Sequence, residues 1–363
     1  MISNDRAGER PPYLAPAPLR DASRWQYLYA TFRQALLDYL TQRTPGTVLM
    51  PEYVPQGVHD PYLRAGWRIV FYPVDLTLAL DAAQVSALVA AHRPEHFVLI
   101  HTFGVYLEEN VRRARQMLPA GTALLEDFAH TLPQEDLPVA GDLAAYSFTK
   151  MLGVPEGALL WIRNRDGFPP CRYSADDSRS LELRARLSRR AALESLFARR
   201  RLPRVAESAL RRLLRGRTEY YDFLQTNYPS IRARIGRRSR DLLERVDFAR
   251  VAARRREIAG LYVGGLDRRL LLPVPAEALT RQALYAFPVQ VDDRAAFHLR
   301  LRARGVRGTM LVDHWWFKEG PSRNELIERH YLLPINHYLR DDTIRRVIDA
   351  VNACAAAGPR DGR

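Results

Sequence analysis

Lysine is almost absent from this chain, and the position of one lysine indicates a reactive amine. Of the 55 basic residues only two are lysines, Lys150 and Lys318. A guanidinium group stays protonated at neutral pH, so a lysine retained against this bias can supply a neutral amine that condenses with an aldehyde. We interpret Lys318, beside Glu319 and Gly320, as a loop residue retained by chance. For Lys150 the sequence favours a Schiff base, with chance retention as the alternative.

The residues around Lys150 carry a set of short motifs. From Leu124 to Leu160 the sequence reads LLEDFAHTLPQEDLPVAGDLAAYSFTKMLGVPEGALL. Four short motifs in this stretch resemble the core of the DegT/StrS family of sugar aminotransferases: E-D-x-A-H, G-D, Y-S-F-x-K and G-V-P-E-G. Members of that family are pyridoxal-phosphate-dependent enzymes of fold type I. The resemblance implies that Asp127 pairs with the pyridine nitrogen, Ser147 binds the cofactor phosphate and Lys150 forms the internal Schiff base. The S-F-x-K step is two residues shorter than the common S-F-x-x-x-K form, as in a side branch of the family.

The chemistry of a pyridoxal ring gives a separate reason to single out Asp127. The ring withdraws electrons only while its nitrogen stays protonated, so a buried carboxylate must lie within hydrogen-bonding distance of it. Asp127 ends an apolar strand, and in an open α/β sheet ligands bind outside the carboxyl ends of the strands. His130 is predicted to pack on the cofactor ring or to orient Asp127, with a polar loop residue as an equal alternative.

Three further site residues follow from the resemblance. The family places a Gly-Thr or Ser-Gly step at the start of the first helix, whose amides cradle the phosphate. This chain has Y-A-T-F there instead, so Thr31 is the candidate to bind the phosphate through its hydroxyl and its amide. Tyr53 is the candidate for a ring stacked on the cofactor, with a core tyrosine as the alternative. His101 begins an H-x-x-G step and is assigned to the substrate.

The C-terminal part of the chain supplies the remaining candidates. Residues 236–262 resemble the family segment that carries an arginine or asparagine into the neighbouring subunit, so Arg237 or Arg238 is expected to reach cofactor phosphate or substrate across a dimer interface. A homodimer is implied, because fold-type-I sites lie between subunits. His314, within D-H-W-W, falls where relatives contact substrate, and aromatic packing is the alternative.

The order of the expected elements indicates the fold class. Helices are expected over residues 24–40 and 81–93. A strand that leads into a helix is expected within 47–58, and further strands over 68–74 and 97–104. Alternation of strands and helices through residue 163 predicts an α/β fold with a mostly parallel, doubly wound sheet. We expect a tail at residues 1–22, a large cofactor-binding domain at 23–235 and a small α+β domain at 236–363.

Composition excludes several classes of protein. The chain has 363 residues, 47% hydrophobic and 26% charged, which is enough for two domains with a sizeable core. Its two cysteines, Cys171 and Cys354, form neither a disulfide framework nor a metal site. The N-terminus has no apolar signal core, and no run of about 18 apolar residues occurs. We therefore expect a cytoplasmic protein without a membrane span.

An arginine-rich insertion, residues 176–218, is expected to form two amphipathic helices. Between Arg179 and Arg217 there are 13 arginines and three glutamates, in a chain whose net charge is +14. Such a face is usually solvated, although a membrane surface or an acidic partner is an alternative. Binding to nucleic acid is not expected, because aromatic interleaving and a helix-turn-helix pattern are missing. A basic entrance that attracts a nucleotide diphosphate is the simpler interpretation.

The sequence thus favours a homodimeric pyridoxal-phosphate aminotransferase that acts on a keto sugar. The resemblance implies a nucleotide-linked sugar, glutamate as the amino donor, and a role in polysaccharide or natural-product biosynthesis. The alternative is a degenerate relative that has lost catalysis and acts as a scaffold or regulator through its arginine-rich helices. A sugar dehydratase is opposed by Lys150, because that branch of the family replaces the lysine.

Overall fold

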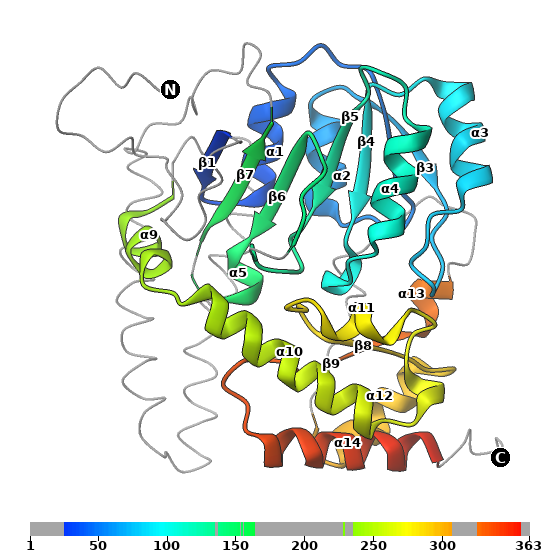
Figure 1. Ribbon diagram of the computed structural model, residues 1–363, viewed down its shortest axis with the longest axis vertical. Helices are drawn as coiled ribbons and strands as arrows, with labels where there is room; N and C mark the ends of the chain where they lie inside the picture. The colour runs from blue at the N-terminus through cyan, green and yellow to red at the C-terminus, as the bar shows by residue number, and fades with distance from the viewer. Residues whose placement is uncertain are drawn as a thin grey trace.

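The computed structural model describes residues 25–134, 137–152, 154, 156–163, 228, 235–306 and 325–356. These residues form a seven-stranded sheet with the order β1-β7-β6-β5-β4-β2-β3 (Figure 1). Strand β7 runs antiparallel to β1 and β6, and the other neighbouring pairs are parallel. The strands are β1 (Trp25–Tyr29), β2 (Thr47–Pro51), β3 (Arg68–Tyr72), β4 (His96–Ile100), β5 (Ala123–Asp127), β6 (Leu143–Ser147) and β7 (Ala158–Ile162). The predicted α/β class with a mostly parallel sheet is confirmed.

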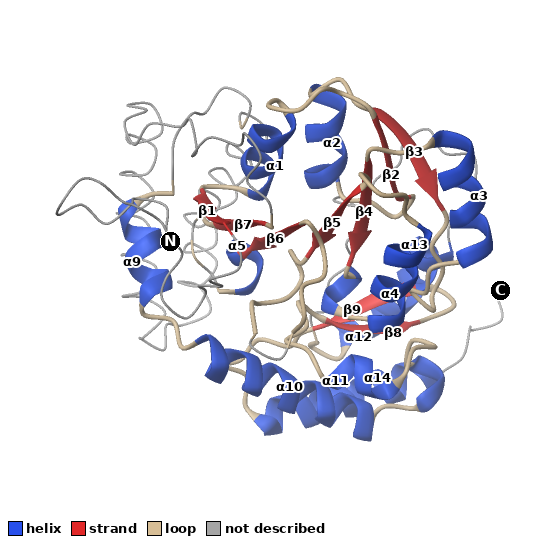
Figure 2. Ribbon diagram, turned by 45° about the horizontal axis from the view of Figure 1, so that its top comes forward, coloured by secondary structure: helices blue, strands red, loops and turns tan. Residues whose placement is uncertain are grey.

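Helices cover both faces of the sheet (Figure 2). Helices α1 (Phe32–Leu40) and α2 (Gln56–Arg64) pack together on one face, and α3 (Ala82–His92) and α4 (Glu108–Met117) pack together on the other. Successive strand residues therefore enter different cores: Val98 joins the cluster under α1 and α2, whereas Phe97 and Leu99 join the cluster under α3 and α4. Burial on both faces explains why the strands read as continuous apolar runs.

The predicted helix over residues 24–40 is wrong over residues 25–31. Residues Trp25–Tyr29 form strand β1, which pairs with β7, and helix α1 begins only at Phe32. Thr31 caps that helix: its hydroxyl accepts a hydrogen bond from Gln34 N, and Thr31 N donates a hydrogen bond to Gln34 Oε1. This capping box is a start signal that fixes the helix boundary, and pairing with β7 satisfies the backbone before it.

The C-terminal part forms a second layer beside the carboxyl edge of the sheet. A two-stranded antiparallel sheet of β8 (Phe287–Gln290) and β9 (His330–Leu333) is packed with helices. These elements are α10 (Phe248–Gly265), η3 (Arg268–Leu270), α11 (Ala276–Thr280), α12 (Arg294–Ala303), α13 (Glu325–Arg329) and α14 (Asp341–Ala356). The start of α10 packs into the core of the large sheet through Phe248 and Ala252, and its later turns pack into the C-terminal core through Ile258 and Tyr262.

Some sequence expectations fall outside the described residues. The tail at 1–22, the arginine-rich insertion at 176–218, Lys318 and His314 all lie there. Within the part of the chain that is described, no helix has the length and apolarity needed to cross a bilayer.

Candidate active site

The carboxyl ends of neighbouring strands bring the principal candidates to one edge of the sheet. Asp127 ends β5 and Ser147 ends β6, and these strands are parallel. The short helix α5 (Phe148–Met151) follows β6 directly and carries Lys150. This edge is where an open α/β sheet binds ligands.

Lys150 lies in a desolvated environment beside a histidine. Its Nζ is 3.1 Å from His130 Nε2. Burial lowers the pKa of Lys150 to about 8, against the opposing effect of the Asp127 carboxylate and with a further lowering by Arg33. About one tenth of the amine is therefore neutral at pH 7 and about half at pH 8, and the neutral form is the one that attacks a carbonyl. Arg33, in the first turn of α1, is a residue near the site that the sequence did not single out.

Asp127 is buried, with an exposed fraction of 2%. Its Oδ1 accepts a hydrogen bond from Ala129 N at 2.8 Å. Burial raises its pKa, and Lys150, the Ala129 amide and His101 counteract that effect in decreasing order. A carboxylate in this position is suited to hold a protonated ring nitrogen.

His130 is held from several sides. Its Nδ1 accepts a hydrogen bond from Phe103 N at 3.1 Å, and its ring stacks on Tyr285 with centroids 4.9 Å apart. Burial and the nearby Lys150 keep the pKa of His130 well below its ordinary value, so the imidazole is neutral. From the sequence, His130 is predicted to pack on the cofactor ring or to orient Asp127. The structure shows in addition that it contacts Lys150.

Gly104 makes the close approach between the turn after β4 and the His130 backbone possible. Its φ is +94°, and a Cβ there would lie 2.3 Å from His130 O and 3.0 Å from Leu284 Cα. We expect Gly104→Ala to lower the free energy of unfolding by about 2–4 kcal/mol, because backbone strain and overpacking add. Chemical denaturation measures the change.

Gly121→Ala is the matched control for that prediction. Gly121 also has a positive φ, +97°, but nothing lies within 4 Å of its added Cβ. This variant should lose only about 1 kcal/mol, from the backbone conformation alone. Equal losses in the two variants would show that the contact with His130 O carries no cost.

The candidate phosphate-binding groups gather at the start of α1. Gly157 N donates to Ala30 O at 2.8 Å, and Phe148 N donates to Gly157 O at 3.0 Å. Strand β7 therefore joins the start of α1 to Ser147, since Ala158 pairs with Tyr29 on one side and with Ser147 on the other. The Ser147 hydroxyl is 3.2 Å from Thr149 Oγ1. The amino terminus of a helix beside a hydroxyl favours an anion.

Tyr53 and His101 are placed in the interior. Tyr53 is fully buried, with its hydroxyl 3.4 Å from His330 Nε2 and its ring edge-on to Phe103. His101 Nε2 is 3.0 Å from Glu126 Oε2, and its ring stacks on Phe128. These contacts favour core positions, and the cofactor and substrate roles assigned to the two residues stay predictions.

The start of α9 (Arg237–Glu244) is tied to the loop after Lys150. Gly236 N donates to the buried Glu156 Oε1 at 2.7 Å, so Arg237 and Arg238 begin a helix anchored next to that loop. The side chains of both arginines, and all of His314, lie outside the described residues. Their roles stay predictions.

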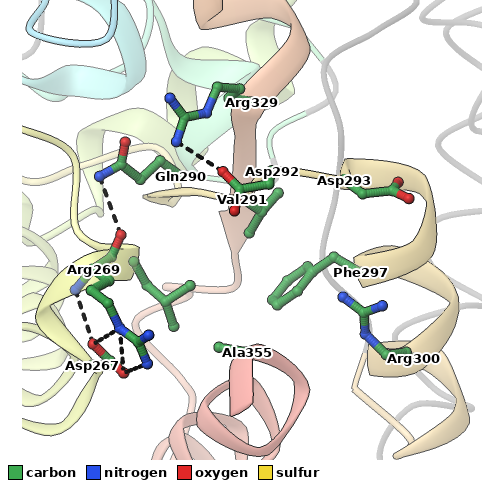
Figure 3. Close-up of a pocket in the computed structure, with 11 residues that line it drawn as sticks. Asp267, Arg269, Gln290, Val291, Asp292, Asp293, Phe297, Arg300, Arg329 and Ala355 are labelled. Carbon is green, nitrogen blue, oxygen red and sulfur yellow. Dashed lines mark hydrogen bonds and ion pairs between the residues drawn. The ribbon is translucent and has the colours of Figure 1, made fainter. Parts of the chain in front are cut away.

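One pocket lies away from these residues, in the C-terminal part (Figure 3). It has a volume of 180 Å³, and β8, α12, η3 and the end of α14 contribute to its walls. Two ion pairs border it, Arg269 with Asp267 and Arg329 with Asp292. It includes none of the candidate site residues, so it is distinct from the site at Lys150.

The comparison with solved structures identifies the fold. No protein-family model matches the chain, and no curated protein matches its sequence significantly. The structure is similar to that of the aminotransferase TlmJ from Streptoalloteichus hindustanus, with a TM-score of 0.60 and 22% identity over 92% of this chain and 86% of that chain. It is similar to a DegT DnrJ EryC1 StrS aminotransferase from Brucella abortus, with a TM-score of 0.58 and 16% identity over 91% and 86%. It is also similar to DesI, solved in the presence of its TDP-sugar product, with a TM-score of 0.62 and 19% identity over 94% and 82%.

The sheet order and the lysine-bearing turn after β6 define a fold-type-I transferase fold. More particularly, this is the fold of the DegT/DnrJ/EryC1/StrS sugar aminotransferases. The resemblance noted in the sequence is confirmed at the level of the fold.

Proposed function

We propose that this protein is a pyridoxal-phosphate-dependent aminotransferase. The observation that carries the proposal is the placement of Lys150, with its lowered pKa, beside the buried Asp127 at the carboxyl edge of the sheet. Folding alone does not require a desolvated amine next to a buried carboxylate, and such groups cluster at functional sites.

The residues present fit the cofactor. The Lys150 amine would hold its aldehyde, Asp127 its ring nitrogen, and Ser147 with the start of α1 its phosphate. When bound, pyridoxal phosphate supplies an electron-accepting ring for the carbon that gains or loses the amino group. Asp127 keeps a negative charge where the ring proton must stay. Lys150 Nζ would move the proton of the substrate carbon as general acid and base.

We propose a keto sugar as the amino acceptor, nucleotide-linked, with glutamate as the donor. DesI, which has the same fold, was solved with a TDP-sugar product. The high arginine content of residues 176–218 suits a diphosphate group, since arginine binds phosphate oxygens in bidentate fashion. A cytoplasmic homodimer in polysaccharide or natural-product biosynthesis completes the proposal, with Arg237 or Arg238 crossing between subunits.

A visible absorption spectrum tests the cofactor and the reaction class. Protein incubated with pyridoxal phosphate and desalted should show a visible band that borohydride abolishes and that glutamate bleaches. Peptide mapping after reduction should find the cofactor on Lys150, and a Lys318→Arg variant should behave like the wild type. A protein that retains no cofactor at saturating concentrations contradicts the proposal.

One observation favours the alternative of a catalytically inactive scaffold. The hydroxyl and amide of Thr31, expected to bind phosphate, are both hydrogen-bonded to Gln34 in the capping box. If phosphate binding needs those two groups, affinity for the cofactor is low. The spectrum separates the two functions, because a scaffold shows no band that responds to glutamate.

A further inference from the structure

The tautomer of His130 is fixed by a backbone group. Phe103 N lies 3.1 Å from His130 Nδ1. An amide N–H only donates, so Nδ1 must be the acceptor and carry no proton. A neutral imidazole has one N–H, which the hydrogen-bond network therefore assigns to Nε2.

Two contacts hold Phe103 in position for this bond. Phe103 has φ +61° and ψ 0°, a left-handed conformation that is uncommon for a bulky residue. Its carbonyl accepts a hydrogen bond from Tyr285 N at 3.0 Å, and the Tyr285 ring stacks on His130. Contacts from the C-terminal part of the protein therefore stabilise the strained turn. Backbone strain that neighbouring contacts stabilise in this way is typical of functional sites.

The Nε2–H of His130 faces the lysine. Nε2 and Lys150 Nζ are 3.1 Å apart. An ammonium group has three donors and no acceptor, whereas a neutral amine has a lone pair. The hydrogen bond is therefore compatible with a neutral Lys150 and opposes its protonation.

Other charged groups near Lys150 act in opposite directions. The Asp127 carboxylate on β5 favours the ammonium form, and the Arg33 guanidinium on α1 disfavours it. Burial is the largest effect and, together with Arg33, it outweighs Asp127 and brings the pKa of Lys150 to about 8. His130 carries no charge that would add to either effect, because burial keeps its pKa well below the ordinary value.

The geometry points to His130 as a positioning residue: with its tautomer fixed by Phe103 N, it donates Nε2–H to Lys150 and favours the neutral, nucleophilic form of the lysine. The role assigned to Lys150 rests on the proposed function. The hydrogen bonding does not, and it is measured without turnover. If the hydrogen bond from His130 proves absent while the protein still shows the visible band with pyridoxal phosphate, the aminotransferase proposal stands and only this inference fails.

The small number of lysines makes the pKa of Lys150 directly measurable. Full-length protein freed of cofactor and labelled with ¹³C at lysine Cε should give two side-chain signals, and Lys150→Arg assigns them. We expect the Lys150 signal to titrate near pH 8 and to shift upward by about 1 pKa unit in His130→Phe, since one hydrogen bond to the neutral form is lost. In His130→Gln, whose amide retains an acceptor and a donor, the midpoint should stay near that of the wild type.

Imidazole ¹⁵N spectra of the wild type test the tautomer without any substitution. His130 should show a proton on Nε2 and none on Nδ1, unchanged from pH 6 to about pH 9. A proton on Nδ1 would overturn the inference, even if His130→Phe fails to fold. So would a Lys150 midpoint that does not move in a folded His130→Phe variant.

Discussion

Lys150→Ala is expected to lower the rate at which the protein converts glutamate to its keto acid by about 10³-fold or more. The substitution removes both the amine that holds the cofactor aldehyde and the base that moves the substrate proton, and general acid–base catalysis alone contributes 10²–10⁴-fold in enzymes. The rate is measured by coupled detection of the keto acid in the presence of excess pyridoxal phosphate.

The stability of the same variant separates lost chemistry from lost fold. Burial disfavours the charged form of the Lys150 amine, so removing it should leave the unfolding midpoint equal to or above that of the wild type. Lys318→Ala, which removes the other lysine, should keep its rate within about two-fold. Keto acid formation by Lys150→Ala within ten-fold of the wild type would exclude the catalytic role.

The sequence predicted the large sheet well because both of its faces are buried. Continuous apolar runs located the strands, and the helix expected at 81–93 is found as α3 (Ala82–His92). The expected strand over 97–104 ends at Ile100 and turns at Thr102–Gly104. The failure was β1: Leu28 continues the apolar spacing of the helix that follows, but pairing with the distant β7 decides the conformation of Trp25–Tyr29.

The candidate site was only partly predictable from sequence. The family resemblance singled out Asp127, Ser147 and Lys150, and the sequence placed Asp127 at the end of a strand. In the structure Asp127 and Ser147 end neighbouring parallel strands, and Lys150 lies on the short helix that follows Ser147. The contact between His130 and Lys150 depends on the left-handed backbone of Phe103 and on a segment more than 150 residues away at Tyr285. Neither a φ value nor such a long-range contact can be read from residue types in a single sequence.

Arg255 joins the site to the C-terminal part of the protein. It lies on α10 with an exposed fraction of 1%. Its guanidinium donates to Leu284 O at 2.8 Å, to Tyr285 O at 3.2 Å and to Met151 O at 3.0 Å. Met151 follows Lys150, and Tyr285 stacks on His130, so one side chain fixes the backbones on both sides of the site. Lysine could not replace it, because one ammonium group cannot span carbonyls on two separate elements.

Arg255→Met is therefore expected to lower the free energy of unfolding by about 3–5 kcal/mol, since two buried carbonyls and one partly buried carbonyl lose a charged donor. Urea denaturation measures the loss, and Arg255→Lys should give an intermediate value. Arg250→Met, an exposed arginine on the same helix, should stay within about 0.5 kcal/mol of the wild type. If Arg255→Met and Arg250→Met prove equally stable, the carbonyls of Met151 and Leu284 must find other partners. In that case Arg255 would not be what holds the Tyr285 segment against the site.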